Sequence, residues 1–267
     1  MKCLRHVVLA LSLCFFFAGK ACTKEKPVVV LVHGAFQDAG TWSKVESGLE
    51  AKGCRVIRVN LPGRDGDSAD PQKLTTEDYK QAVLKAISAE NQPVILVGHS
   101  FGGITISNVA EAAPNKIKAL IYLSAYLPKD GESLQSLSQT DEDSKLGKDG
   151  NFVVSPDYKY ASINPENAAE VFANDAQVGD REAIARSLIR EPLAPMANPV
   201  KLTAAQFGRV PKYYIETTQD VVVSPALQER MMQRVEIKRV FKINAGHASY
   251  ITQPNQVTAA ILQAIEK

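Results

Sequence analysis

Short, continuous runs of apolar residues recur along the chain, separated by stretches in which apolar residues return at helical spacing. Such runs predict strands that are buried on both faces, which is typical of a parallel sheet covered by helices. The predicted strands are Pro27–His33, Cys54–Asn60, Pro93–Gly98, Ile117–Ser124, Val210–Thr217 and Val235–Ile243.

Helices are predicted between these strands. They are Trp42–Lys52, Thr75–Ala89, Gly102–Ala113, Pro225–Arg234 and Pro254–Ile265. Because crossovers between parallel strands are right-handed, the alternation predicts an α/β fold with a doubly wound, mostly parallel sheet. The 267 residues, 45% of them hydrophobic and 22% charged, suit one large domain of this class or two small ones.

The segment from residue 127 to about 208 interrupts this alternation. It is rich in Asp, Ser, Pro and Asn, and it holds two short helical patterns, Pro165–Ala173 and Arg181–Ile189. A connection of this length is rarely unstructured inside a compact domain. We therefore expect a small helical cap, inserted into a single domain that spans residues 22–267.

The first 21 residues have the pattern of a secretory signal peptide. Lys2 and Arg5 precede the apolar run Val7–Ala18, and the small residues Gly19 and Ala21 follow it. The run is too short to span a membrane comfortably. The pattern predicts export to the periplasm or the medium, with an uncleaved N-terminal anchor as the alternative.

Two cysteines, Cys22 and Cys54, remain after removal of this segment. Cys22 follows the expected cleavage site directly, so lipid anchoring through Cys22 is an alternative to free secretion. An oxidising compartment would permit a disulfide between the two cysteines; two unpaired thiols are equally compatible with the sequence. The cysteines and histidines have no metal-ligand spacing, so we expect neither a metal nor a cofactor.

The charge of the chain gives no reason to expect binding to nucleic acid or to an anionic surface. The net charge is +2. It falls to about −1 when the signal segment leaves with Lys2, Arg5 and Lys20. A small molecule is therefore the expected partner, and the sequence leaves the oligomeric state open.

The stretch "PVILVGHSFGG", residues 93–103, is where a predicted strand runs directly into a predicted helix. Gly-x-Ser-x-Gly between a strand and a helix is the pattern of a nucleophile elbow, in which the turn is so tight that Gly98 and Gly102 must flank Ser100. The helix N-terminus would also favour negative charge near Ser100. A strand-to-helix turn with a serine cap is the structural alternative.

A serine nucleophile needs a base, and the base needs a carboxylate. His247 follows the last predicted strand in "INAGHASY" and is the best placed of the four histidines, although a surface histidine with no role is the alternative. The acid is expected after the strand that follows the cap, where "YYIETTQD" offers Asp220 in the loop and Glu216 within the strand. We favour Asp220.

Acyl transfer also needs hydrogen-bond donors for the oxyanion. One is the backbone N–H of Phe101, the residue after the nucleophile. The other is expected in "HGAFQDAGTW" after the first strand, where Gly34 lets the backbone approach and Ala35 presents its N–H. Gly34 in an ordinary strand-ending turn is the alternative.

With these residues in place, the sequence resembles the α/β-hydrolase superfamily. Within it, the chain is similar to the branch of plant methylesterases (salicylate-binding esterases), hydroxynitrile lyases and bacterial esterases. The resemblance covers nearly the whole mature chain and rests on "VLVHGAFQDAGTW", "VILVGHSFGG", "ALIYLSAYLPKDGES", "YIETTQDVVVSPALQERM" and "NAGHASYITQP". It implies Ser100 as nucleophile, Asp220 as acid, His247 as base, and Ala35 and Phe101 as oxyanion donors.

The resemblance also separates activities within this branch. The lyases carry a threonine after the first-strand histidine and a lysine after the catalytic histidine, whereas this chain has Gly34 and Ala248. We therefore expect hydrolysis of small or medium carboxylic esters. Lactonase, cofactor-free oxygenase, perhydrolase and lyase chemistry are alternatives, as is a non-catalytic small-ligand binding protein. Apolar residues of the cap either line a substrate pocket or form the cap's own core; they are Phe152, Phe172, Met196 and Phe207.

Overall fold

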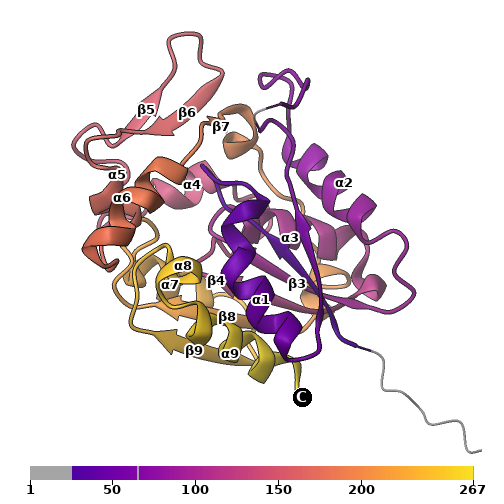
Figure 1. Ribbon diagram of the computed structural model, residues 1–267. Coiled ribbons are helices and arrows are strands. Elements are labelled where there is room, and N and C mark those ends of the chain that lie inside the picture. Colours follow the sequence, from indigo (N-terminus) through magenta and orange to yellow (C-terminus); the bar gives the residue numbers. More distant parts are fainter. Residues whose placement is uncertain (1–25, 65, 267) are drawn as a thin grey trace, which may run out of the picture.

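A sheet of six parallel strands forms the centre of the molecule (Figure 1). The structure, a computed structural model, describes residues 26–64 and 66–266. The strands are β1 (Val28–Val32), β2 (Arg55–Val59), β3 (Val94–His99), β4 (Ile117–Leu123), β8 (Lys212–Thr217) and β9 (Arg239–Ile243). Their order is β2-β1-β3-β4-β8-β9, which confirms the predicted doubly wound α/β fold.

Each predicted strand is present, and most differ from the prediction by one or two residues at an end. The exception is β9, which begins at Arg239 although the apolar pattern begins at Val235. Residues 235–238 instead join a helix to this strand, and the side chains of Glu236 and Lys238 form an exposed ion pair there.

Helices cover both faces of the sheet (Figure 1). They are α1 (Ser43–Ala51), α2 (Thr76–Ala86), α3 (Gly102–Ala112), α7 (Pro225–Met232), α8 (Ser249–Thr252) and α9 (Pro254–Ile265), with 3₁₀ turns at Ala39–Trp42, Pro114–Lys116, Ala194–Ala197 and Phe207–Arg209. Helix α1 packs against α9, and α2 packs against α3. In α9 the buried residues Val257, Ile261 and Ala264 share one face, since residues three or four positions apart are neighbours on a helix.

The segment between β4 and β8 forms a cap over the sheet's carboxyl edge (Figure 1). It contains α4 (Leu134–Ser138), α5 (Ala168–Phe172) and α6 (Val178–Ser187). It also contains an antiparallel sheet of β5 (Phe152–Val154), β6 (Tyr160–Ile163) and β7 (Glu191–Pro192), which was not predicted. These strands are only two to four residues long, too short to produce a readable alternation of apolar and polar residues.

Several expectations concern residues outside the described part of the chain. The signal peptide at residues 1–21 and any modification of Cys22 belong there. Cys54 is buried and forms no disulfide with another described residue. Export, lipid anchoring and a Cys22–Cys54 disulfide therefore stay predictions. Within residues 26–64 and 66–266, no helix is both long enough and apolar enough to cross a membrane.

Candidate active site

Ser100 lies in a strained turn between β3 and α3. Its φ angle is 51°, in the left-handed region that residues with a side chain seldom adopt. The turn is possible because its neighbours are glycines. A Cβ on Gly98 would lie 2.6 Å from the carbonyl oxygen of Gly102, and a Cβ on Gly102 would lie 2.7 Å from that of Val32. The backbone at Ser100 thus has the geometry expected of a nucleophile elbow.

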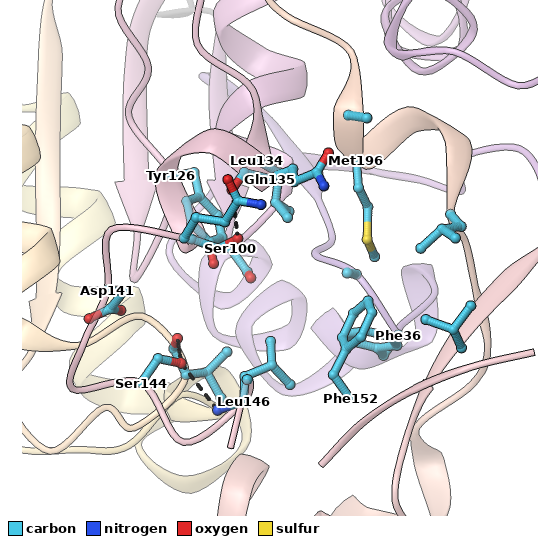
Figure 2. Close-up of a pocket in the computed structure, with 18 of the residues that line it drawn as sticks. Phe36, Ser100, Tyr126, Leu134, Gln135, Asp141, Ser144, Leu146, Phe152 and Met196 are labelled. Carbon is cyan, nitrogen blue, oxygen red and sulfur yellow. Dashed lines mark hydrogen bonds between the residues drawn. The ribbon is translucent and has the colours of Figure 1, made fainter. Parts of the chain in front are cut away.

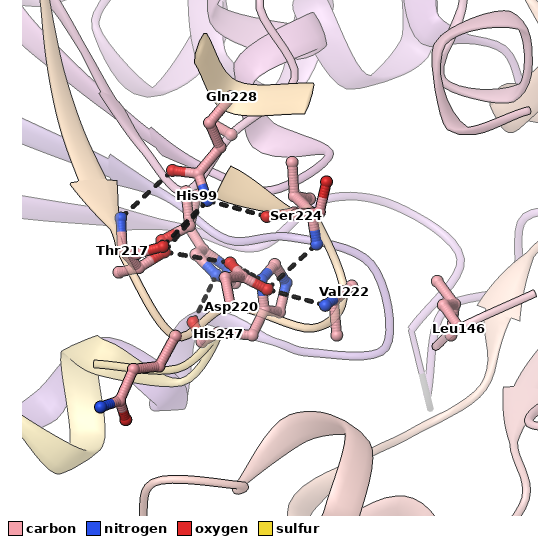
Figure 3. Close-up of polar contacts among 12 residues, drawn as sticks. His99, Leu146, Thr217, Asp220, Val222, Ser224, Gln228 and His247 are labelled. Carbon is pink, nitrogen blue, oxygen red and sulfur yellow. Dashed lines mark hydrogen bonds and ion pairs between the residues drawn. The ribbon is translucent and has the colours of Figure 1, made fainter. Parts of the chain in front are cut away.

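His247 and Asp220 come from two different loops and meet in the interior (Figure 3). The Nδ1 atom of His247 lies 2.8 Å from Oδ2 of Asp220. The same carboxylate accepts hydrogen bonds from the Thr217 hydroxyl, at 3.0 Å, and from the backbone N–H groups of Val222 and Val223, at 2.8 and 3.0 Å. These hydrogen bonds fix the orientation of the carboxylate towards the imidazole.

The other ring nitrogen of His247 has no partner. Nε2 is buried and makes no hydrogen bond with a described residue. If Nδ1 carries the proton that faces Asp220, Nε2 has a free lone pair, as a general base requires. The Ser100 hydroxyl likewise makes no hydrogen bond with a residue in the described ranges 26–64 and 66–266. Catalytic hydrogen bonds often form only when substrate binds.

Glu216, the alternative acid, and His99, the histidine next to Ser100, make other contacts. Glu216 faces away from His247 and pairs with Lys242, with Oε2 and Nζ 3.0 Å apart. His99 lies against His247 with ring centroids 4.5 Å apart, and its Nε2 is 3.1 Å from the backbone oxygen of His247. Burial, His247 and His33 together lower the pKa of His99 well below its usual value, so His99 stays neutral.

Two backbone N–H groups near Ser100 are free to bind an oxyanion. Those of Ala35 and Phe101 donate no hydrogen bond to any described residue. Gly34 lets the Ala35 N–H come close to Ser100, because a Cβ at residue 34 would lie 2.7 Å from Cβ of Ser100 and 2.9 Å from Nδ1 of His99. Any side chain at residue 34 would therefore displace either the loop or Ser100.

A buried ion pair joins the loop after β2 to the cap, and its carboxylate also binds the loop after β1; sequence reasoning missed it. Glu191 of β7 accepts the Phe36 N–H at 3.1 Å, the Tyr79 hydroxyl at 2.8 Å and Nη2 of Arg64 at 2.7 Å. The Ile189 N–H donates to the Phe36 carbonyl at 2.9 Å, so both backbone polar groups of Phe36 are bound by the cap. No sequence motif joins these residues, which lie far apart in the chain.

Ser100 opens into a cavity of about 1020 Å³ under the cap (Figure 2). Apolar side chains line its interior; they are Ala35, Phe36, Leu134, Leu146, Phe152, Val154, Phe172, Leu193, Met196 and Val222. Phe36 makes edge-to-face contacts with Phe152 and Phe172. Exposed polar residues such as Gln135, Gln139 and Lys148 also line the cavity. An apolar interior with a few polar groups is typical of a small-molecule site.

The four apolar cap residues divide between the two alternatives left open above. Phe152, Phe172 and Met196 line the cavity. Phe207 does not. It is buried near β8, where the Lys212 ammonium lies 4.1 Å from the centre of its ring. Across the described residues, no group of three or more His, Cys, Asp or Glu side chains is arranged to hold a metal ion.

Comparisons with known proteins place this geometry in context. The sequence profile of the Alpha/beta hydrolase family matches residues 29–261. Methylesterase 7 of Arabidopsis thaliana is 29% identical over 254 residues, which are 89% of this chain and 96% of that protein.

Solved structures are similar as well. A pyrethroid hydrolase from Sphingobium faniae has a TM-score of 0.79 at 25% identity, covering 91% of this chain and 98% of that one. Polyneuridine aldehyde esterase has a TM-score of 0.78 at 25% identity, covering 90% of this chain and 100% of that one.

Proposed function

Because the chain belongs to the alpha/beta hydrolase family, we propose that it hydrolyses carboxylic esters through Ser100, His247 and Asp220. The proteins to which it is similar are named as a methylesterase, a pyrethroid hydrolase and a polyneuridine aldehyde esterase, which supports ester hydrolysis. One observation carries the residue assignment: His247 is bound through Nδ1 to the buried Asp220, while its Nε2 has no partner.

The first half of the reaction forms an acyl-enzyme. Nε2 of His247 takes the proton of the Ser100 hydroxyl as Oγ attacks the ester carbonyl carbon. The carbonyl oxygen becomes an oxyanion and accepts hydrogen bonds from the Ala35 and Phe101 N–H groups, each contributing about 3–4 kcal/mol. The imidazolium then protonates the leaving alcohol, and the bond between the carbonyl carbon and the alcohol oxygen breaks.

The second half releases the acid. Nε2 of His247 accepts a proton from water, whose oxygen attacks the acyl carbon. The imidazolium returns the proton to Oγ of Ser100 as the acyl bond breaks. Asp220 stays ionised throughout, holding the ring orientation and stabilising the imidazolium.

The cavity supports a substrate with at least one apolar part. Its volume of about 1020 Å³ is at the upper end of the range for small-molecule sites, and its inner wall is aromatic and aliphatic. We infer a small or medium ester with an apolar acyl or alcohol group. A lactone would use the same machinery. Gly34 disfavours the lyase reaction, because it lacks the threonine side chain that the lyases carry at this position.

Hydrolysis of p-nitrophenyl acetate and butyrate tests the proposed function. Wild type is compared with Ser100→Ala and with the matched control Ser47→Ala, which removes an exposed hydroxyl on α1. We expect Ser100→Ala to lose several orders of magnitude in kcat and Ser47→Ala to match wild type. Equal rates for wild type and Ser100→Ala would overturn the assignment of Ser100.

We also propose that the chain is exported, on the basis of the signal-peptide pattern in residues 1–21. Expression of the whole chain in a bacterial host, followed by N-terminal sequencing and intact mass, tests this. Cleavage before Cys22 supports export, and a mass increase of a lipid size would assign an anchor there. An N-terminus at residue 1 would overturn the proposal.

A further inference from the structure

The hydroxyl of Tyr126 is unlike those of the other deeply buried tyrosines. The hydroxyls of Tyr79, Tyr122, Tyr214 and Tyr250 bind Glu191, Ser107, Ala125 and Gln37 respectively. Tyr126 is 2% exposed, yet its hydroxyl makes no hydrogen bond with a described residue. The hydroxyl faces the cavity, so a substrate that displaces water there must either supply a hydrogen-bond acceptor or leave this donor unpaired.

Tyr126 lies beside the nucleophile and lines the same cavity (Figure 2). Its backbone N–H donates to the carbonyl oxygen of Ser100 at 3.1 Å. Its own carbonyl is packed so closely on Gly103 that a Cβ there would lie 2.2 Å from the oxygen. The position of Tyr126 relative to Ser100 is therefore fixed by the backbone on both sides.

The phenol is a donor rather than a base. Burial raises the pKa of Tyr126, and the negative charges of Asp141 and Asp220 raise it further. Asp141 makes no hydrogen bond with the phenol; its two oxygens accept from the N–H and the hydroxyl of Ser224. The hydroxyl thus stays protonated, with only the cavity in which to find an acceptor.

We propose that Tyr126 is a specificity-determining residue that donates a hydrogen bond to a second oxygen of the substrate, outside the ester group. The inference rests on the proposed function of Ser100. The scissile carbonyl oxygen is bound by the Ala35 and Phe101 N–H groups, and His247 protonates the leaving oxygen. The hydroxyl of Tyr126 is left for another acceptor, so the preferred esters carry an ether, keto or hydroxyl oxygen close to the scissile carbonyl.

This preference follows from the free-energy cost of leaving a hydrogen-bond donor unpaired. An alkyl substrate that fills the cavity leaves the Tyr126 hydroxyl without water or partner, whereas one with an acceptor at that place satisfies it. Sites that hydrogen-bond a substrate group discriminate against analogues that lack it.

Two pairs of isosteric esters test the proposal, each differing by one ether oxygen in place of a methylene. p-Nitrophenyl methoxyacetate and butyrate probe the acyl side; 2-methoxyethyl and butyl benzoate probe the alcohol side. The readout is the ratio of kcat/KM within each pair, in wild type and in Tyr126→Phe, so that intrinsic reactivity cancels. Tyr213→Phe is the control, because Tyr213 lies outside the cavity.

We expect the ether-to-alkyl ratio to fall about tenfold in Tyr126→Phe for at least one pair, and to stay constant in Tyr213→Phe. The thermal midpoint of Tyr126→Phe should match or exceed that of wild type, since the lost hydroxyl has no protein partner. Unchanged ratios in both pairs, or a uniform loss on all four esters, would overturn the proposal while leaving ester hydrolysis intact. If wild type and Ser100→Ala are equally inactive on all four, the proposed function fails with it.

Discussion

Replacing Glu191 should destabilise the protein more than removing Glu191 and Arg64 together. The two side chains form an ion pair that is almost entirely buried, 4% exposed for Arg64 and 0% for Glu191. Burial disfavours the charge on Arg64, but Glu191 and Tyr79 outweigh it and raise the pKa of Arg64 above its usual value. Because an arginine guanidinium keeps its proton in proteins even when buried, Arg64 stays charged whether or not a carboxylate faces it.

The expected loss of unfolding free energy depends on which buried polar groups each substitution leaves unpaired. Glu191→Met leaves a buried guanidinium without its carboxylate, which costs about 3–5 kcal/mol of unfolding free energy. Arg64→Met leaves a buried carboxylate that still accepts from Tyr79 and from the Phe36 N–H. In the double variant both charges are gone, and the Phe36 N–H and the Tyr79 hydroxyl lose these partners, so a smaller loss of about 1–3 kcal/mol is expected.

Urea unfolding of wild type, both single variants and the double variant measures this coupling. Kinetics on the same proteins adds a second readout, because Phe36 follows Ala35, the proposed oxyanion donor, and Glu191 binds the Phe36 N–H. We expect kcat of Glu191→Met to fall by up to about 10²–10³, the effect of losing one oxyanion donor. The reasoning would be refuted if the losses of the two single variants added up to that of the double variant. A loss of less than about 1 kcal/mol in Glu191→Met would refute it as well.

Three further predictions concern the site and its surroundings. Asp220→Asn should lower kcat about 10⁴-fold, as loss of the triad acid does in serine proteases, whereas Glu216→Gln should lie within a few-fold of wild type; comparable losses would show that the acid is misassigned. Gly34→Ala should reduce kcat strongly, because its Cβ would lie 2.7 Å from Cβ of Ser100, while Gly179→Ala, with no atom nearby, should leave kcat unchanged; equal kcat values in the two variants would contradict this contact. Burial and Arg64 lower the pKa of His33 to about 3, against 6.5 when unfolded, so the unfolded chain takes up the proton first as the pH falls. His33 should therefore cost about 2 kcal/mol of unfolding free energy between pH 7 and pH 5, and urea midpoints that do not shift would count against a buried neutral imidazole.

The fold could be predicted from the sequence because its helices and strands have clear local sequence patterns. Strand β1 is a continuous apolar run, β3 is apolar from Val94 to Val97, and both strands are buried at every position. The capping box of α2, in which the Thr75 and Asp78 side chains each bind the other's backbone N–H, is likewise a local signal. Such features depend on neighbours in the chain and can be read without knowing the tertiary structure.

What the sequence could not provide depends on distant residues. Glu191 of the cap and Arg64 of the loop after β2 are joined only when the chain folds, so neither residue is distinguishable from a surface charge beforehand. Tyr126 reads as one more apolar position after β4, since only the structure shows that its hydroxyl lacks a partner. The short strands β5, β6 and β7 are stabilised by pairing with one another rather than by their own pattern.

Mapping a covalent adduct tests the central claim most directly. Purified wild type, Ser100→Ala and His247→Ala are incubated with a fluorophosphonate, and intact mass and peptide mass locate the modified residue. We predict one adduct on wild type at Ser100, none on Ser100→Ala, and much slower labelling of His247→Ala, because Ser100 depends on the free Nε2 for its reactivity. A folded wild type that is not labelled, or an adduct that persists in Ser100→Ala, would contradict the account.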